Sequence, residues 1–566
     1  MQYRQAEASP QPSCAPSPLS PPAPAGGDAA GRGGQSADAN RHLPNRAALL
    51  CTPQPIPGST TMPPIAQTTT GRIQGSREDD LTVFRGVPYA APPVADLRFR
   101  APQPHPGWDG VRDATEFAPI SLQEGMDALD ALLPSPPQEQ SEDCLYLNLW
   151  TPGLDDAARP VMLWIHGGAF TLGSGSEPLY SGAHLARRGD VVVVTINYRL
   201  GALGFLHEPV LGESNFGMRD MIAALRWVQD NIANFGGDPN NVTIFGESAG
   251  GAAVACLLVS REARGRFHRA IGMSTAGDHG ILFDGTQPTT DQLYAQLGIE
   301  QPSAEQLRRL PASDLLAAQA AVEAAAFESL NEMWSVRLPF GPTIDGAFLT
   351  EPPLATAART SAERGIPFLS GNPDEEMKLI RAMMPPEVLS QDDVMVRLAA
   401  IPGGADLVYA AYHDARADRG EPAGPDDILD AVASDFLEIM PSLRFADAWA
   451  RGGAPTFGYT LDWKSPMNDG ALGSCHALDI PFAFGTHADA PDFAGAGPSA
   501  DALANTMIDI WTTFARNGNP AIDGLEWPPY DPDNDRQSRA QMMLGPNLRV
   551  ETAWRATERS VWDGVF

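Results

Sequence analysis

The pentapeptide Gly246-Glu247-Ser248-Ala249-Gly250 constrains the fold of this chain more than any other segment. An apolar, β-branched run at 241–245 precedes it, and a run of small and apolar residues at 251–258 follows it. This order predicts a strand, a sharp turn and a helix, with glycines where a bulky side chain would obstruct the turn. The pentapeptide alone is weak evidence, since about 0.3 chance matches are expected in a chain of this glycine content. Its flanks make an ordinary glycine-rich loop a poor explanation.

Short β-branched runs alternate with amphipathic stretches along most of the chain. The runs predicted to be strands are 161–165, 191–196, 242–245, 270–273 and 366–369. Residues 218–234 carry apolar side chains every three or four positions, which predicts a helix between two of these strands. This alternation is typical of a large, mostly parallel sheet flanked by helices. Together with the serine turn, it predicts the α/β-hydrolase fold.

Two Ala- and Leu-rich regions, near 287–335 and 385–450, interrupt the alternation. We expect them to be helical insertions that cap the carboxyl ends of the strands. Residues 1–64 are rich in Pro, Ala, Gly and Ser. A segment of this composition buries too little apolar surface to offset the conformational entropy that it would lose on folding. We therefore predict a disordered tail at 1–64 and a catalytic domain at 65–566. Met62 lies at this boundary, which suggests the hypothesis that translation starts there.

The sequence is strongly acidic, with 39 Lys and Arg residues, 70 Asp and Glu residues and a formal net charge of -31. This charge repels phosphates, so nucleic acid is not expected as a partner, and most of it is expected to be solvated surface. No apolar run reaches the about 20 residues that a membrane span needs.

The five cysteines lie far apart without a C-x-x-C pair, so neither a disulfide framework nor a zinc site is predicted. No secretory signal is visible, and a cytoplasmic location is expected.

A reactive serine needs a general base, usually a histidine, and that base needs a carboxylate that orients it. On the predicted fold the chain order is serine, acid, histidine. The histidines downstream of the serine are His268, His279, His413, His476 and His487. His268 enters a predicted strand and His413 lies in a helical stretch, so both read as structural or surface residues. His476 follows Gly473-Ser474-Cys475 on a predicted loop, which favours it over His487.

Three carboxylates, Asp374, Glu375 and Glu376, follow the predicted strand at 366–369. All three stand where the acid is expected, and the pattern does not choose among them. An ordinary acidic turn would give the same pattern.

The segment His166-Gly167-Gly168-Ala169-Phe170 follows the predicted strand at 161–165. Its backbone amides are free of bulky neighbours and would suit the stabilisation of a negatively charged oxygen. A glycine pair after a strand is also common in a simple turn.

Further segments accompany the serine pentapeptide in a fixed order: Phe84-Arg85-Gly86-Val87-Pro88-Tyr89-Ala90, Ser141-Glu142-Asp143-Cys144-Leu145-Tyr146-Leu147-Asn148, Asn197-Tyr198-Arg199 and Asn234-Phe235-Gly236-Gly237-Asp238-Pro239. With these blocks the chain resembles the type-B carboxylesterase family from about residue 64 to 566. That family includes cholinesterases, liver carboxylesterases, bacterial para-nitrobenzyl esterases and the non-catalytic neuroligins.

The resemblance assigns roles to single residues. It implies that Ser248 is the nucleophile, and that His476 is the base because Asp479 follows three positions later. It places the acid at Glu376, with Glu375 in the Asp position of a Gly-x-x-x-Asp-Glu pattern. The amides that the family uses to hold the oxyanion fall on Gly168, Ala169 and Ala249. No metal or organic cofactor is implied.

The chain also departs from parts of the family. Secreted members pair the cysteine that matches Cys144 with an upstream cysteine, and Ser121 stands in that upstream position here. Cholinesterases carry a tryptophan for choline binding in the intervening loop, whereas residues 122–143 contain none. The disulfide is therefore not expected, and choline esters are poor candidate substrates.

The resemblance implies a serine ester hydrolase that acts on small to medium esters through an acyl-enzyme intermediate. A carbamate or amide hydrolase with the same triad is the alternative within enzymes. A neuroligin-like binding protein is the alternative from another class, and the intact serine, acid and histidine argue against it.

Overall fold

The chain divides into two units, residues 1–61 and 62–566, and the fold described below belongs to the second. The computed structural model describes residues 62–275, 287–328, 338–401, 403–532, 539–552 and 554–565. Most of the predicted tail at 1–64 lies outside the described residues, and its disorder stays a prediction. The first backbone contact of the unit is made by Pro64, whose carbonyl accepts from Gly75 N at 2.9 Å.

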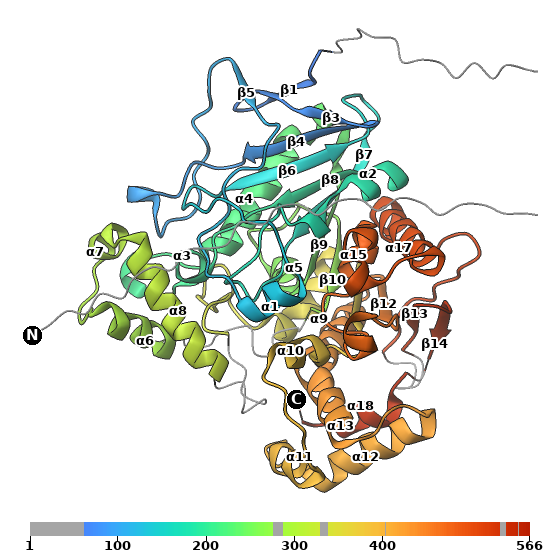
Figure 1. Ribbon diagram of the computed structural model, residues 1–566. Coiled ribbons are helices and arrows are strands. Elements are labelled where there is room, and N and C mark those ends of the chain that lie inside the picture. The colour runs from blue at the N-terminus through green and yellow to red at the C-terminus, as the bar shows by residue number, and fades with distance from the viewer. Residues whose placement is uncertain are drawn as a thin grey trace, which may run out of the picture. The chain divides into compact units, whose positions relative to one another are not determined.

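Among the described residues, eleven strands form one sheet with a parallel centre and antiparallel edges (Figure 1). The central strands, in spatial order, are β13 (Gln541–Leu544), β12 (Thr456–Leu461), β11 (Phe368–Pro373), β10 (Arg269–Met273), β9 (Gly237–Glu247), β7 (Arg159–Ile165) and β8 (Val192–Ile196). The antiparallel edges are β14 (Arg549–Glu551) on one side and β6 (Tyr146–Thr151), β4 (Leu81–Pro88) and β3 (Ser76–Glu78) on the other. A small second sheet holds β1 (Ile65–Thr68), β2 (Gly71–Gln74) and β5 (Val111–Asp113).

The five predicted strands are confirmed as β7, β8, β9, β10 and β11, with shifted ends. β9 starts five residues before the predicted position, at Gly237. β11 starts at Phe368 instead of residue 366, because Pro367 has no amide hydrogen to donate to a ladder. The predicted helix at 218–234 is α4 (Phe216–Asn231), followed by a 3-10 turn at Ile232–Phe235.

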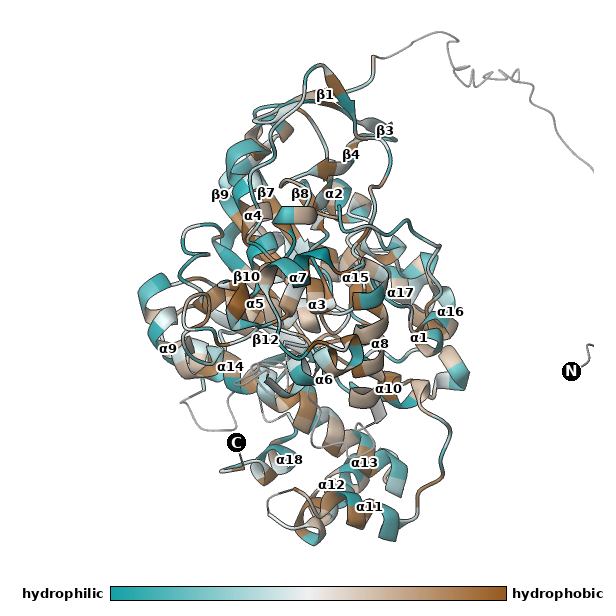
Figure 2. Ribbon diagram, turned by 90° about the vertical axis from the view of Figure 1, so that its left-hand side faces the viewer, coloured by the Kyte–Doolittle hydropathy of each residue, from teal (hydrophilic) through white to brown (hydrophobic). Residues whose placement is uncertain are grey.

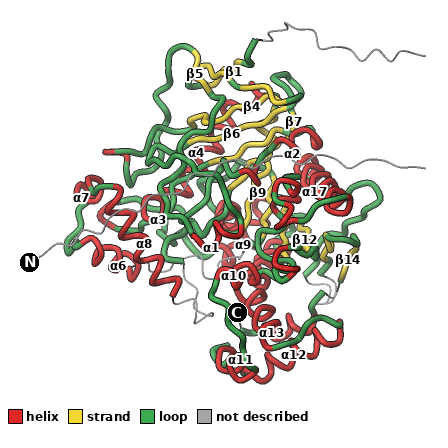
Figure 3. The backbone as a smooth tube through the Cα atoms, in the orientation of Figure 1, coloured by secondary structure: helices red, strands yellow, loops and turns green. Residues whose placement is uncertain are grey.

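Helices cover both faces of the sheet, and the strand layer runs between them in Figure 3. Alternate residues of each strand supply the two cores. In β7, Leu163 and Ile165 enter the core shared with α4, α5 (Ala249–Val259), α9 (Pro353–Arg364) and α14 (Met440–Arg451). Met162 and Trp164 enter the opposite core, shared with α2 (Ala183–Gly189), α15 (Ile480–Phe484) and α17 (Pro498–Asn517). This period of two is the pattern expected of strands that are covered on both faces.

The regions expected to be helical insertions contain further helices. Near 287–335 lie α6 (Gln287–Leu297), α7 (Ala304–Arg309) and α8 (Ala312–Glu328), on the left of Figure 1. Near 385–450 lie α11 (Gln391–Leu398), α12 (Ala405–Arg419), α13 (Pro425–Ser434) and a π-helical turn, η6 (Asp435–Ile439), which leads into α14. The remaining helices are α1 (Asp127–Leu132), α3 (Gly201–Phe205), α10 (Met377–Met383), α16 (Pro491–Ala494) and α18 (Ala556–Val561).

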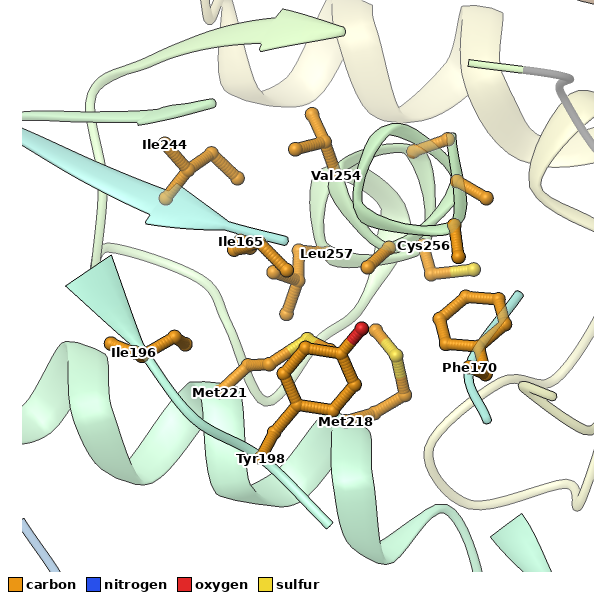
Figure 4. Close-up of a cluster of buried hydrophobic side chains, with 14 of the residues drawn as sticks. Ile165, Phe170, Ile196, Tyr198, Met218, Met221, Ile244, Val254, Cys256 and Leu257 are labelled. Atoms are coloured by element: carbon orange, nitrogen blue, oxygen red, sulfur yellow. The ribbon is translucent and has the colours of Figure 1, made fainter. Parts of the chain in front are cut away.

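Helix α5 is buried from Ala249 to Leu258 and is predominantly brown in the hydropathy view of Figure 2. In Figure 4, Val254 and Leu257 of this helix lie in one buried cluster with Ile165, the last residue of β7, and Ile244 of β9. Such close packing fixes α5 against the sheet. Among the described helices, none is both long enough and apolar enough to cross a membrane.

Candidate active site

Ser248 lies between the end of β9 and the start of α5, as the sequence predicts. Its φ of 56° and ψ of -124° are unusual for a residue other than glycine, so the turn is strained. The amide of Ser248 donates to the Met273 carbonyl at 3.0 Å, which ties the turn to the end of β10. A Cβ at Gly250 would collide with the carbonyl of Ile165, so only glycine permits this close approach of helix and strand.

The segment after β7 packs against this turn. Gly168, Ala169 and Phe170 all have positive φ, at 102°, 53° and 61°, and the Gly168 carbonyl accepts from Leu172 N at 2.9 Å. A Cβ at Gly167 would lie 3.1 Å from Ser248 Cβ, so the loop backbone passes directly beside the serine. The glycines therefore allow main-chain amides to approach Ser248 more closely than any bulky residue would.

A buried histidine supports the same loop. The His166 ring stacks on Tyr198, with ring centroids 4.3 Å apart, and the Tyr198 hydroxyl donates to the His166 carbonyl at 2.9 Å. Burial lowers the pKa of His166 to about 4, so its ring is neutral near pH 7. We assign it to the support of the loop.

His476 and Glu376 meet, although 100 residues of sequence separate them. His476 Nδ1 lies 2.7 Å from Glu376 Oε2, and His476 N donates to the Glu376 carbonyl at 3.1 Å. Glu376 is fully buried, and its Oε1 accepts from Ser274 Oγ at 2.7 Å and from Asn372 Nδ2 at 2.8 Å. A carboxylate held in this way fixes the orientation of the imidazole ring.

The other ring nitrogen of His476 faces a second carboxylate. His476 Nε2 lies 3.1 Å from Glu247 Oε1, and Glu247 is the residue directly before Ser248. The ring therefore reaches the serine turn with the nitrogen opposite to the one that contacts Glu376. Although burial alone would lower the pKa of His476, Glu247 and Glu376 outweigh it and hold that pKa well above its ordinary value.

Further carboxylates surround this pair. Burial raises the pKa of Glu247 to about 8, that of Glu438 in η6 to about 8, and that of Asp479 to about 7. Asp479 accepts from the Tyr459 hydroxyl at 2.7 Å. Several buried acids therefore surround one imidazole. Because the raised pKa values of these acids lie near neutral pH, the acids and the imidazole titrate as a coupled group.

The other predicted candidates have different partners. His487 Nε2 contacts Asp501 at 2.9 Å, His413 is exposed beside Asp414, and His268 Nδ1 accepts from Val242 N at 3.1 Å. His279 lies outside the described residues. Of the acids, Asp374 pairs with Arg555 at 2.9 Å, and Glu375 pairs with Lys464 at 2.6 Å.

The sequence analysis did not predict the residues that hydrogen-bond to Glu376 or the additional carboxylate that lies near His476. Ser274 and Asn372 do follow or end strands, so their position at the carboxyl edge of the sheet was a usable signal. Glu438 lies in an insertion and had no such signal. Within the described part of the chain, no group of His, Cys, Asp and Glu side chains is arranged to hold a metal ion.

Comparison with known proteins decides the family. A model described as "Carboxylesterase family" matches residues 62–562. The chain belongs to the carboxylesterase family. It is 36% identical to the para-nitrobenzyl esterase of Bacillus subtilis (strain 168) over 497 residues, which cover 86% of this chain and 96% of that protein. It is 37% identical to the phenmedipham hydrolase of Pseudarthrobacter oxydans, with 83% and 94% covered.

Solved structures agree with these relatives. A thermophilic para-nitrobenzyl esterase superposes with a TM-score of 0.75 at 35% identity, with 89% of this chain and 99% of that chain covered. A carboxylesterase of Geobacillus stearothermophilus, EST55, also superposes with a TM-score of 0.75 at 35% identity, with 88% of this chain and 99% of that chain covered. The predicted α/β-hydrolase fold is confirmed, and this carboxylesterase is a serine ester hydrolase.

One expected departure from the family has a clear structural basis. The Ser121 hydroxyl lies beside the Cys144 thiol, so the serine does stand opposite the cysteine. Both residues are buried, and burial raises the pKa of the Cys144 thiol to about 12. This thiol is therefore a packing group of low reactivity.

Proposed function

We propose that Ser248, His476 and Glu376 are the catalytic triad of this carboxylesterase. The observation that carries the proposal is the placement of one imidazole, with Nδ1 on Glu376 and Nε2 beside the residue that precedes Ser248. A histidine held this way can accept a proton at Nε2 while its Nδ1–H stays bound to the acid. The strained conformation of the half-buried Ser248 supports the role of a nucleophile held on a sharp turn.

In the proposed reaction, His476 Nε2 takes the Ser248 hydroxyl proton as Oγ forms a bond to the ester carbonyl carbon. The tetrahedral intermediate collapses with cleavage of the carbon–oxygen bond to the alcohol, which leaves with the proton from the imidazolium. Water then attacks the acyl-enzyme with His476 as base, which releases the acid and restores Ser248.

The proposed oxyanion donors are the amides of Gly168, Ala169 and Ala249. Ala249 is the first residue of α5, and the first amides of a helix have no acceptor within the helix. The positive φ of Gly168 and Ala169 supports a loop shaped to present its amides. Loss of a single such donor typically costs about 10²- to 10³-fold in rate.

The Ser248→Ala variant tests the triad. We expect the rate of p-nitrophenyl butyrate hydrolysis to fall by about 10⁴-fold or more, because the acyl-enzyme cannot form. Ser260→Ala, at a buried serine just beyond α5, is the matched control and should keep a rate close to that of the wild type. Turnover by Ser248→Ala at a near-normal rate would refute the assignment.

We expect small to medium esters to be the substrates, as the name of the para-nitrobenzyl esterase relative suggests. The phenmedipham hydrolase relative keeps a second candidate open, the hydrolysis of carbamates by the same triad. A p-nitrophenyl ester and a p-nitrophenyl carbamate, which release the same phenol, decide between these, and the corresponding p-nitroanilide tests amide hydrolysis. The proposal predicts the highest kcat/KM for an ester, and a carbamate that matches or exceeds it would favour the second candidate.

A cytoplasmic location is part of the proposal. The Cys144 thiol beside Ser121 supports it, because secreted members of the family are expected to have a disulfide there. Fractionation of the native host with activity staining tests it, and activity confined to the medium would contradict it.

A further inference from the structure

The loop that carries Glu376 and the loop that carries His476 are joined by their backbones. Glu375 N donates to the Ser474 carbonyl at 2.8 Å, and two residues later His476 N donates to the Glu376 carbonyl at 3.1 Å. The two loops therefore run side by side just where the acid and the imidazole meet. Any slip between them changes the Nδ1 to Oε2 contact directly.

The Glu375 side chain adds a second link between these loops. Its Oε2 accepts from Ser474 N at 2.9 Å and from Lys464 Nζ at 2.6 Å, and its Oε1 pairs with Lys378 Nζ at 2.8 Å. Only 12% of the side chain is exposed. Burial would raise the pKa of Glu375, but the two lysines outweigh it and hold that pKa well below its ordinary value. Glu375 is therefore an anion at neutral pH.

The histidine loop is shaped to receive this carboxylate. Gly473 has a φ of 55°, and a Cβ at this position would collide with the Glu375 carboxylate. Ser474 Oγ donates to the Leu461 carbonyl at 2.6 Å, which fixes the same loop to the end of β12. The glycine and the serine thus hold the Ser474 amide at the position where Glu375 binds it.

We propose that Glu375 is a positioning residue, whose carboxylate locks the histidine loop onto the acid loop and so holds His476 in register with Glu376. The inference rests on the proposed triad. Glu375 acts through His476 and has no expected contact with substrate. Its loss should therefore lower kcat and leave KM nearly unchanged.

The glutamate at this position departs from the family pattern. The family pattern has an aspartate here, whose shorter side chain ends one methylene earlier. In this chain the longer side chain reaches one backbone amide and two lysines at once. Misplacement of a catalytic group by about 1 Å can cost about 10²-fold in rate, so even a small relaxation of the link should be measurable.

The test compares Glu375→Ala and Glu375→Gln with the wild type. Glu421→Ala is the matched control, because Glu421 is also a carboxylate paired with two cations, Arg419 at 2.8 Å and Arg416 at 3.6 Å, and its ion pairs are to α12 and not to either loop. Gly473→Ala disturbs the same link from the opposite side. Each variant is assayed for kcat and KM with p-nitrophenyl butyrate, and is titrated with a fluorophosphonate, which reacts covalently with an activated serine.

We expect kcat of Glu375→Ala to fall by about 10- to 100-fold, with KM within about twofold of the wild-type value. The kcat of Glu375→Gln and of Gly473→Ala should also fall, and the kcat of Glu421→Ala should stay at the wild-type value. Fluorophosphonate should still label every molecule of Glu375→Ala, but more slowly, because all sites are folded and poorly aligned.

Three results would overturn the proposal. One is wild-type kcat in both Glu375 variants, and another is a loss of rate shared by Glu421→Ala. The third is a labelled fraction that falls with an unchanged labelling rate, which indicates partial unfolding. If Glu375→Ala does not fold, the isosteric Glu375→Gln carries the same measurement. A wild-type enzyme that resists fluorophosphonate would instead refute the proposed triad, so the two failures are distinguishable.

Discussion

At the scale of single residues, the site is defined by how carboxylates surround one imidazole. His476 contacts Glu376 through Nδ1 and Glu247 through Nε2, and both contacts favour the protonated ring. A general base must be neutral, so the raised pKa of His476 places the acid limb of the activity profile above the pH expected for an ordinary histidine. The same raised pKa stabilises the fold fully below pH about 6.5, and this contribution is lost as pH rises through the folded-state value.

The Glu247→Gln variant should move the acid limb of kcat/KM to lower pH. Glu247 raises the pKa of His476, so its removal lowers that pKa and leaves the base neutral in more acidic solution. The profile is measured with a substrate whose leaving group does not titrate in the range. Asp501→Asn, which alters only the pairing of His487, is the control and should leave the limb in place. A limb that stays fixed or moves to higher pH in Glu247→Gln would show that Glu247 does not act on His476.

At the scale of elements, the sequence predicted what depends on local pattern. The strand, turn and helix around Ser248 follow from apolar periodicity and glycine spacing, and β9 and α5 confirm them. The choice of the catalytic acid needed the family pattern. Asp374, Glu375 and Glu376 are all carboxylates that follow the same strand, so the local sequence does not distinguish them. The contact between Glu247 and His476 was not predictable, since it depends on how a loop 229 residues downstream of Glu247 packs against the serine turn.

The Ser121→Cys variant should form a disulfide with Cys144. The two side chains already lie beside each other, and oxidation would close the loop at 121–144. In the chain-entropy model, a disulfide that closes a loop of this length stabilises the fold by about 3 kcal/mol. The variant also loses the hydrogen bond that Ser121 Oγ accepts from Leu200 N, which reduces the gain by about 1 kcal/mol. Thiol titration and thermal unfolding with and without reductant check it, with Ser121→Ala as control. An unchanged thiol count after mild oxidation would contradict the predicted geometry.

At the scale of the whole molecule, the sheet is held by two cores, and the alternation of short β-branched runs with amphipathic stretches along the sequence made this architecture predictable. The packing of the helical insertions was not predictable to the same degree. In the region near 287–335, Gln319 of α8 accepts from Ala202 N of α3, a contact between residues 117 positions apart in the sequence. The net charge of -31 describes the solvated surface and says nothing of the fold.

Removal of residues 1–61 should leave kcat/KM within about twofold and the thermal midpoint unchanged within error. The family match begins at residue 62, and the second unit contains the whole sheet and the proposed triad. A shortened chain that begins at Met62 is compared with the full chain in the same assay. A marked loss of activity or stability would show that the first unit contributes to the enzyme.

The most direct test of the central claim is to trap the acyl-enzyme. The wild-type enzyme is mixed with p-nitrophenyl acetate, quenched in acid during turnover, digested and mapped by mass spectrometry. The account predicts an acetyl group on the peptide that carries Ser248, and none on that peptide in His476→Ala. Acetylation of a different residue during productive turnover, or turnover without any acylated serine, would contradict it.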